Sequence, residues 1–127
     1  MQRVTGIGGI FFRASDPVAL ARWYTEHLGV EAFSEAEDRT WWQAGGPTVW
    51  APFAEDTEYF GRREQAWMAD FRVGDLDAML EQLRAAGAGV DDRVEALPGI
   101  GRFGWATDPE GNRFELWEPA PEALTRP

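Results

Sequence analysis

The sequence predicts an α+β protein in which one structural plan, a strand, a helix and then three strands, occurs twice. Two similar strings, Phe12-Arg13-Ala14-Ser15-Asp16 and Phe71-Arg72-Val73-Gly74-Asp75, open the repeats 59 residues apart, close to half of the 127-residue chain. A run with helical spacing of apolar residues follows each string, and short strand-like runs follow each helix. Neither repeat could bury both faces of its sheet alone, so we expect one domain over residues 1–127.

Residue types that begin and end helices delimit both predicted helices. In the first repeat Asp16 is suited to cap the helix, Pro17 suits its first position, and Gly29 ends it. In the second repeat Asp75 takes the capping position and Gly87 ends the helix. Apolar residues recur at helical spacing between these limits, at Leu20, Trp23, Tyr24 and Leu28 and at Leu76, Met79, Leu80 and Leu83.

Strands are expected before and after each helix. One precedes each helix, at Val4–Arg13 and Ala66–Val73. The others are bounded by turn residues, at Ala32–Glu35, Thr40–Ala44, Thr48–Phe53, Val90–Ala96, Gly101–Thr107 and Arg113–Glu118. These limits give half-modules over about 4–53 and 66–118, joined by a polar connecting loop at about 54–65. The tail at 120–127 is expected to be frayed.

Composition limits the functions that the chain can have. Twelve Lys and Arg against 22 Asp and Glu give a net charge of −10, which repels nucleic-acid phosphates and anionic membranes, so we expect neither partner. The lack of cysteine excludes disulfides and thiolate metal sites. No long apolar run or leader pattern is present, which favours a cytoplasmic location. Seven Trp and 8 Phe are enough to line an apolar pocket as well as a core.

The most specific string is Asp108-Pro109-Glu110-Gly111-Asn112-Arg113-Phe114-Glu115-Leu116-Trp117, a turn followed by an alternating strand. Together with the helix end Trp23-Tyr24-Thr25-Glu26-His27-Leu28-Gly29 and the repeated plan, it resembles the vicinal oxygen chelate superfamily. That superfamily holds glyoxalase I, bleomycin resistance proteins and extradiol dioxygenases. The resemblance extends to about Pro119 and implies a concave, partly open, barrel-like sheet and a homodimer.

Enzymes of this superfamily usually bind one divalent metal through His and Glu residues on the first and last strands of each half. Counted from the helix caps and the closing strands, these positions fall on Gly9, Thr48, Met68 and Glu115. A carboxylate with a hydroxyl, a thioether and a glycine is a poor ligand set for a divalent metal. We therefore expect no cofactor, with a metal on Glu115 as the alternative. The only histidine, His27, lies near a helix end, where a structural role is favoured.

Alternation along the strands indicates which side chains share the concave face with Glu115. The expected ligand-binding residues are Phe11, Arg13, Thr48, Trp50, Met68, Asp70, Arg72, Phe103, Trp105, Arg113, Glu115 and Trp117. This set predicts a cavity with aromatic walls and a charged centre. Ile10, Phe12, Trp67, Phe71, Phe114 and Leu116 then face the helices as core.

Several assignments within this cavity stay open. The arginines either pair with the carboxylates to brace the sheet or hold an anionic group of a ligand. Phe103 and Trp105 share one face, either as a wall of the cavity or as core under a helix. The adjacent Trp41 and Trp42 face opposite ways, and the sequence does not tell which of them faces the cavity. The loop tip Tyr59-Phe60-Gly61 is a candidate lid.

Three functions fit these features. The favoured hypothesis is a metal-independent protein that binds a small aromatic or cationic molecule in a Trp-lined cavity. The alternative is a glyoxalase- or dioxygenase-like enzyme that uses Glu115 as a metal ligand or as a general base, because a carboxylate in an apolar pocket is able to abstract a proton next to a carbonyl. A third hypothesis is a structural or regulatory module that dimerises or binds another protein.

Overall fold

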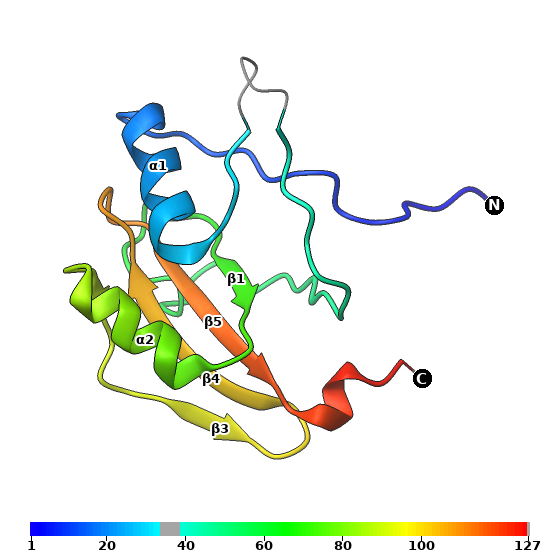
Figure 1. Ribbon diagram of the computed structural model, residues 1–127. Coiled ribbons are helices and arrows are strands. Elements are labelled where there is room, and N and C mark those ends of the chain that lie inside the picture. Colours follow the sequence, from blue (N-terminus) through cyan, green and yellow to red (C-terminus); the bar gives the residue numbers. More distant parts are fainter. Residues whose placement is uncertain (34–38, 127) are drawn as a thin grey trace.

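The structure, a computed structural model, describes residues 1–33 and 39–126. Within these two ranges the chain forms two helices and five strands, arranged as Figure 1 shows. In chain order they are α1 (Pro17–Leu28), β1 (Ala69–Arg72), α2 (Leu76–Ala85), β2 (Gly89–Val90), β3 (Glu95–Leu97), β4 (Gly101–Thr107) and β5 (Arg113–Pro119), followed by the 3-10 turn η1 (Pro121–Leu124). No helix in the described ranges is long and apolar enough to cross a membrane.

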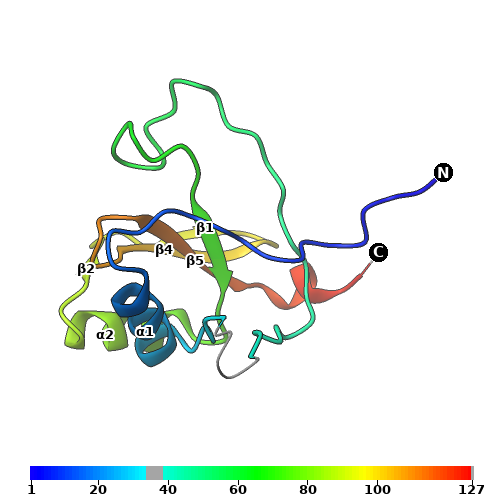
Figure 2. The ribbon, with the colours of Figure 1, turned by 90° about the horizontal axis from the view of Figure 1, so that it is seen from above.

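The five strands form one open, mixed sheet. Their order is β1-β5-β4-β2, and β3 also pairs with β4. β1 runs parallel to β5, whereas the β4 pairings are antiparallel. Both helices lie on one side of this sheet, and the loop at 54–65 lies on the other (Figure 2). The α+β class and the open sheet are therefore confirmed, and the second repeat forms the predicted strand and helix and then four strands where three were predicted.

The core lies between α2 and the sheet. The buried stripe Leu76, Leu80 and Leu83 packs against Ala106, Phe114 and Leu116 of β4 and β5. Trp23 extends this layer to α1, since its ring lies 6.3 Å from that of Phe114. Gly104 permits the close approach of α2, because a Cβ at this position would lie only 3.1 Å from a methyl of Leu80. The helix-facing positions expected on β1 and β5 are thus correct.

Both helices begin where the capping residues predict. The Asp16 carboxylate accepts from the Ala19 N–H, and the Asp75 carboxylate accepts from the Ala78 N–H. α1 ends at Gly29, which adopts the left-handed conformation with φ 69°. A second carboxylate also reaches the start of each helix, since Glu110 accepts from the Ser15 and Asp16 N–H groups, and Glu118 accepts from the Leu76 N–H.

Residues Asp108 to Asn112 form the β4–β5 turn, and hydrogen bonds of Asp108 link this turn to α1. Asp108, which is 4% exposed, accepts from the backbone N–H groups of Glu110 and Asn112 and from the Asn112 amide. It also accepts a 2.8 Å hydrogen bond from the Tyr24 hydroxyl on α1. Burial beside this carboxylate raises the pKa of Tyr24 well above its usual range. The most specific motif of the sequence therefore fixes the fold around the site.

Several strands that were predicted in the first repeat are not formed. Within the described residues, Val4–Arg13, 32–33, Thr40–Ala44 and Thr48–Phe53 form no strand, apart from an isolated bridge at Arg39; the end of Ala32–Glu35 lies outside the described residues. Glycines at 6, 8 and 9 and at 45 and 46 lie in or beside these stretches and weaken strand formation. Both views show the N-terminal stretch running away from the sheet (Figures 1 and 2).

Two smaller predictions are also wrong. The strand expected at Val90–Ala96 is split into β2 and β3, because the pairing with β4 is interrupted after the Asp91 N–H, which bonds to the Trp105 carbonyl at 2.9 Å. The tail expected to be frayed forms the turn η1 at Pro121–Leu124, and the Ala120 N–H bonds to the Ile100 carbonyl at 2.9 Å. Pro127 lies outside the described residues.

Candidate functional site

The helix-free face of the sheet carries two rows of side chains that cross three strands. The register places Asp70 opposite Glu115, and Glu115 opposite Trp105. The next row along the strands is Arg72, Trp117 and Phe103. Side chains on neighbouring strands at paired positions leave the sheet on the same face. The chain therefore brings together six of the residues predicted for the concave face, and Arg113 follows on β5 two residues before Glu115.

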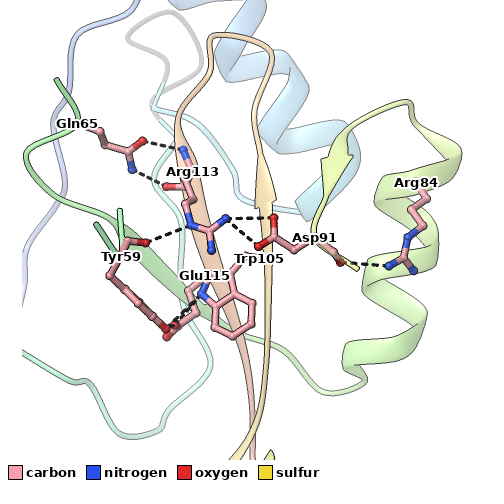
Figure 3. Close-up of polar contacts among 7 residues, drawn as sticks. All are labelled: Tyr59, Gln65, Arg84, Asp91, Trp105, Arg113 and Glu115. Carbon is pink, nitrogen blue, oxygen red and sulfur yellow. Dashed lines mark hydrogen bonds and ion pairs between the residues drawn. The ribbon is translucent and has the colours of Figure 1, made fainter. Parts of the chain in front are cut away.

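Glu115 is the polar centre of this face. It is 8% exposed, and one of its oxygens, Oε2, accepts from the Trp105 indole N–H at 3.0 Å and from the Tyr59 hydroxyl (Figure 3). The Trp105 N–H also lies 3.2 Å from the Tyr59 hydroxyl oxygen. Burial and the adjacent carboxylate raise the pKa of Tyr59 above its usual range, so this hydroxyl keeps its proton and remains a donor.

Asp70 lies beside Glu115 on β1, where water reaches it. Desolvation by the surrounding protein is the largest cause that raises its pKa, and the hydrogen bond and negative charge of Glu115 add to it, whereas Arg72 lowers it. Together these effects raise the pKa of Asp70 to about 8. The pair Asp70 and Glu115 therefore holds one proton between two carboxyl groups over much of the neutral range.

Trp105 is 1% exposed and lies between cations and the Tyr59 ring. The Arg93 guanidinium lies 4.6 Å from its ring centroid and that of Arg113 lies 5.6 Å away. The Tyr59 ring meets it edge-on at 6.1 Å. Trp105 projects from the face opposite α2, so the interpretation as core under a helix is wrong, and its place in the wall of a ligand cavity stays a prediction.

Arg113 is held by its neighbours and does not face Glu115 as an ion-pair partner. Its guanidinium pairs with Asp91 at 3.0 Å and donates to the Tyr59 carbonyl (Figure 3). The Gln65 amide brackets the Arg113 backbone, donating to its carbonyl at 2.7 Å and accepting from its N–H at 2.8 Å. These contacts attach the connecting loop to β5, which places Tyr59 over Glu115.

The second row forms an aromatic wall. The rings of Phe103 and Trp117 stack with centroids 6.0 Å apart and an interplanar angle of 4°. Trp117 is 6% exposed, and its indole N–H donates to the Ile100 carbonyl at 2.9 Å, which fixes its orientation. Arg72 ends this row on β1, and its guanidinium donates to the Ala44 carbonyl at 3.1 Å. Phe103 is half-buried, so it is the more accessible ring of this stacked pair.

The first-repeat residues that were predicted for this face do not join the cluster within one chain. Phe11 is 95% exposed and Trp50 is 83% exposed, so neither ring packs against the cluster. Arg13 lines a polar surface pocket with Arg62, Glu110 and Asn112, and Thr48 is exposed. Met68 precedes β1 and is half-buried.

Tyr59 belongs to the loop tip that was predicted as a candidate lid, whereas the other partners of the cluster outside the sheet were not predicted. Asp91 and Arg93 belong to the segment expected as strand, although the charged string Asp91-Asp92-Arg93 was a sign against a buried strand. Gln65 carries no signal in the sequence. Trp41 lines a separate groove of about 390 Å³ on the helix side with Met79 and Leu116 of the second repeat, whereas Trp42 is 91% exposed.

The donor set around Glu115 does not fit a divalent metal. Its nearest polar neighbours include an indole N–H and a hydroxyl hydrogen, both directed at the oxygen that a metal would need. Among the residues that the structure describes, no three His, Cys, Asp or Glu side chains lie close enough together to hold an ion. Divalent metals in proteins need several oxygen or imidazole ligands, so we derive no chemistry from a metal here.

Comparison with known proteins places this geometry in a family. The model of the glyoxalase-like domain matches residues 9–117. A curated protein from Mycobacterium bovis, "Putative glyoxylase CFP32", is 38% identical over 56 residues, which are 44% of this chain. The matched part is only 22% of that relative's length. The same protein of Mycobacterium tuberculosis matches equally.

Two solved structures share the fold. TnmS3, an antibiotic binding protein from Streptomyces sp. CB03234, matches with a TM-score of 0.62 and 18% identity, over 94% of this chain and 100% of that chain. A member of the glyoxalase/bleomycin resistance protein/dioxygenase superfamily from Sphaerobacter thermophilus matches with a TM-score of 0.52 and 23% identity, over 83% of this chain and 90% of that one. Since the family model spans most of the sequence and the fold agrees, the chain belongs to the glyoxalase-like domain family of the vicinal oxygen chelate superfamily.

Proposed function

We propose that the protein binds a small aromatic molecule, without a metal, on the helix-free face of its sheet. The observation that carries this proposal is the set of aromatic rings beside a buried carboxylate: the Trp105 indole donates to Glu115, and the stacked Phe103 and Trp117 rings form the next row on the same face. A flat apolar surface with a few oriented polar groups is typical of small-molecule sites. The family and the similar antibiotic binding protein support a binding role.

The polar groups of this face indicate which chemical groups the ligand carries. Glu115 Oε2 already accepts two donors, whereas its neighbour Asp70 reaches solvent and is able to bond a hydroxyl or ammonium group of a ligand. The net charge of −10 also favours a neutral or cationic molecule over an anion. Arg113 is paired with Asp91 and is therefore not the clamp for an anionic group.

Quenching of tryptophan fluorescence tests the proposal. Neutral and cationic planar aromatic compounds are titrated into the protein, and at least one class is expected to bind with a Kd below about 1 mM. Trp117→Leu removes half of the stacked pair and is expected to weaken that binding at least about tenfold. Trp41→Phe is the matched control, since Trp41 lines the groove on the helix side. A screen without a binder, or equal losses in both variants, would refute the proposal.

A second candidate function is proton transfer on a bound carbonyl compound. The observation that favours it is the pair Asp70 and Glu115, because the pKa of Asp70 lies near neutrality and general bases work best there. Hydrogen–deuterium exchange next to the carbonyl of a bound aromatic ketone, followed by NMR, measures this activity. Glu115→Gln is expected to slow the exchange about 100-fold. An unchanged rate in this variant would exclude the enzyme.

A further inference from the structure

The side chain of Tyr59 is a phenol group that the connecting loop places against the sheet. Its hydroxyl donates to Glu115 Oε2, and the Trp105 indole N–H donates to the same hydroxyl at 3.2 Å (Figure 3). Its ring meets the Trp105 ring edge-on at 6.1 Å, with an interplanar angle of 88°. The same ring stacks on that of Phe53 at 5.4 Å, with an interplanar angle of 24°. These contacts form a cradle for one phenol group beside Glu115, and Tyr59 occupies it.

The loop is attached to the sheet by contacts that do not involve the Tyr59 ring. The Arg113 guanidinium donates to the Tyr59 carbonyl at 3.2 Å, and the Tyr59 N–H donates to the Thr57 hydroxyl at 3.2 Å. The Gln65 amide brackets the Arg113 backbone. The Tyr59 side chain is only half-buried. Rotation about its Cα–Cβ bond is therefore expected to carry the ring into solvent while the loop stays attached to β5.

The groups around the Tyr59 hydroxyl select a neutral hydroxyl group. Glu115 accepts from this position and the Trp105 N–H donates to it, so the group bound here has to donate and accept. A carboxylate has no hydrogen to donate and would bring a second negative charge beside Glu115. An ammonium group would direct its hydrogens against the Trp105 N–H. Burial and the Glu115 charge raise the pKa of Tyr59 above its usual range, so a phenol in this place stays protonated.

We propose that Tyr59 is an internal competitor for this cradle, and that a phenolic ligand binds by displacing the Tyr59 side chain from Glu115. The hydroxyl of the ligand then takes over both hydrogen bonds of the Tyr59 hydroxyl. Its ring takes over the contacts with Phe53 and Trp105. The inference rests on the proposed function in one respect, since it places an aromatic ligand on this face. It adds the class of the ligand and the residue that limits its affinity.

Competition with a side chain of the same protein has a characteristic effect on affinity. The exchange replaces one phenol by another, so the hydrogen bonds of Glu115 and Trp105 are kept. A group tethered close to its site competes at an effective concentration of about millimolar or more. The apparent Kd of the ligand is its intrinsic Kd divided by the fraction of molecules whose cradle is open. Removal of Tyr59 is therefore expected to strengthen phenol binding, whereas removal of a residue that contacts the ligand would weaken it.

Calorimetric titration with phenol tests the sign of this effect. Tyr59→Ala is expected to bind phenol with a Kd below about 1 mM, at least about tenfold more tightly than the wild type. Tyr59→Phe is expected to lie between the two, because its ring still fills the cradle but donates no hydrogen bond to Glu115. Circular dichroism checks the fold, and Tyr59→Phe keeps the packing of the loop if Tyr59→Ala does not. Phenol affinity that neither substitution raises would overturn the proposal.

Two controls link the effect to the cradle. Phe60→Ala also removes an aromatic ring from the loop, one that lies 5.1 Å from the ring of Phe53 and 6.4 Å from that of Tyr59, and its phenol affinity is expected to equal that of the wild type. Methoxybenzene keeps the ring and the oxygen of phenol but has no hydrogen to donate. It is expected to bind Tyr59→Ala at least about tenfold more weakly than phenol does. An equal gain in Phe60→Ala, or equal affinities for the two compounds, would overturn the proposal.

The outcomes for the inference and for the proposed function are distinguishable. A Tyr59→Ala variant that binds phenol, beside a wild type that binds no aromatic compound, would refute the proposed function and support the internal competition by Tyr59. A wild type that binds aromatic compounds with an affinity that Tyr59→Ala does not raise would refute the internal competition alone.

Discussion

Asp70 and Glu115 are paired across the parallel strands β1 and β5, and both side chains leave the sheet on its helix-free face. Two carboxyl groups that interact in this way do not ionise independently, because the negative charge of one disfavours loss of the proton from the other. The Trp105 N–H and the Tyr59 hydroxyl both donate to Glu115. The described contacts give Asp70 no such donors, and its pKa is raised. Asp70 is therefore the member of the pair that keeps the proton.

This pair makes the protein less stable as the pH rises. The pKa of Asp70 is about 8 in the folded state against 3.8 in a model compound, so the folded state binds more protons between these values. Its contribution to the free energy of unfolding is complete below about pH 4 and is lost as the pH rises through about 8. Asp70→Asn is expected to raise Tm at pH 8.5 by a few degrees and to change it little at pH 4, since access to water limits the effect.

Thermal unfolding of Asp70→Asn and wild type from pH 4 to 9 checks this prediction. Asp92→Asn is the control, because Asp92 is exposed in the segment between β2 and β3. A difference in Tm between Asp70→Asn and wild type that does not grow with pH would contradict the assignment of the proton to this pair.

The hydroxyl of Tyr59 stabilises the buried Glu115 carboxylate. Tyr59→Phe removes this donor and leaves Glu115 with the Trp105 N–H, so we expect a loss of about 1–3 kcal/mol in the free energy of unfolding. Denaturant unfolding measures it. In a double-mutant cycle with Glu115→Gln, the two losses are expected to be non-additive. Additive losses would show that the two groups do not interact.

The sequence predicted the fold of the second repeat better than that of the first. Capping residues and the apolar stripe located α1 and α2 within a residue or two, because these signals act locally. Alternation and turn residues predicted strands at Gly101–Thr107 and Arg113–Glu118, and β4 and β5 match these ranges to within one residue. The first repeat carries similar signals, but a strand needs a neighbour, and its glycines leave register and partner weakly specified.

The sequence likewise predicted only part of the candidate site. Alternation assigned the face of Asp70, Glu115 and Trp117 correctly, since side chains on a strand have a strict period of two. It could not reveal that Arg113 pairs with Asp91. That contact depends on the irregular path between β2 and β3, which no periodic pattern encodes.

The hydrogen bonds of Asp108 are expected to be the main interactions that hold the β4–β5 turn against α1. Asp108→Ala removes the acceptor of the Tyr24 hydroxyl and of two backbone N–H groups in the turn. Buried donors without partners are costly, so we expect a loss of about 3 kcal/mol in denaturant unfolding. The exposed Asp92→Ala is the control, with a change within about 0.5 kcal/mol. Similar losses in both variants would mean that the turn does not hold α1.

Gly99, between β3 and β4, and Gly101, the first residue of β4, allow the cost of backbone strain to be measured apart from the cost of steric overlap. Gly99 and Gly101 both have positive φ, 77° and 137°. A Cβ at Gly99 would meet open space, so Gly99→Ala is expected to cost only the conformational penalty, about 1–2 kcal/mol. A Cβ at Gly101 would overlap the Glu118 carbonyl and lie 2.8 Å from the Trp117 indole nitrogen. Gly101→Ala is therefore expected to cost about 3 kcal/mol or more and to displace Trp117. Denaturant unfolding and the emission maximum of tryptophan measure the two effects, and equal costs at both positions would show that β5 does not press against Gly101.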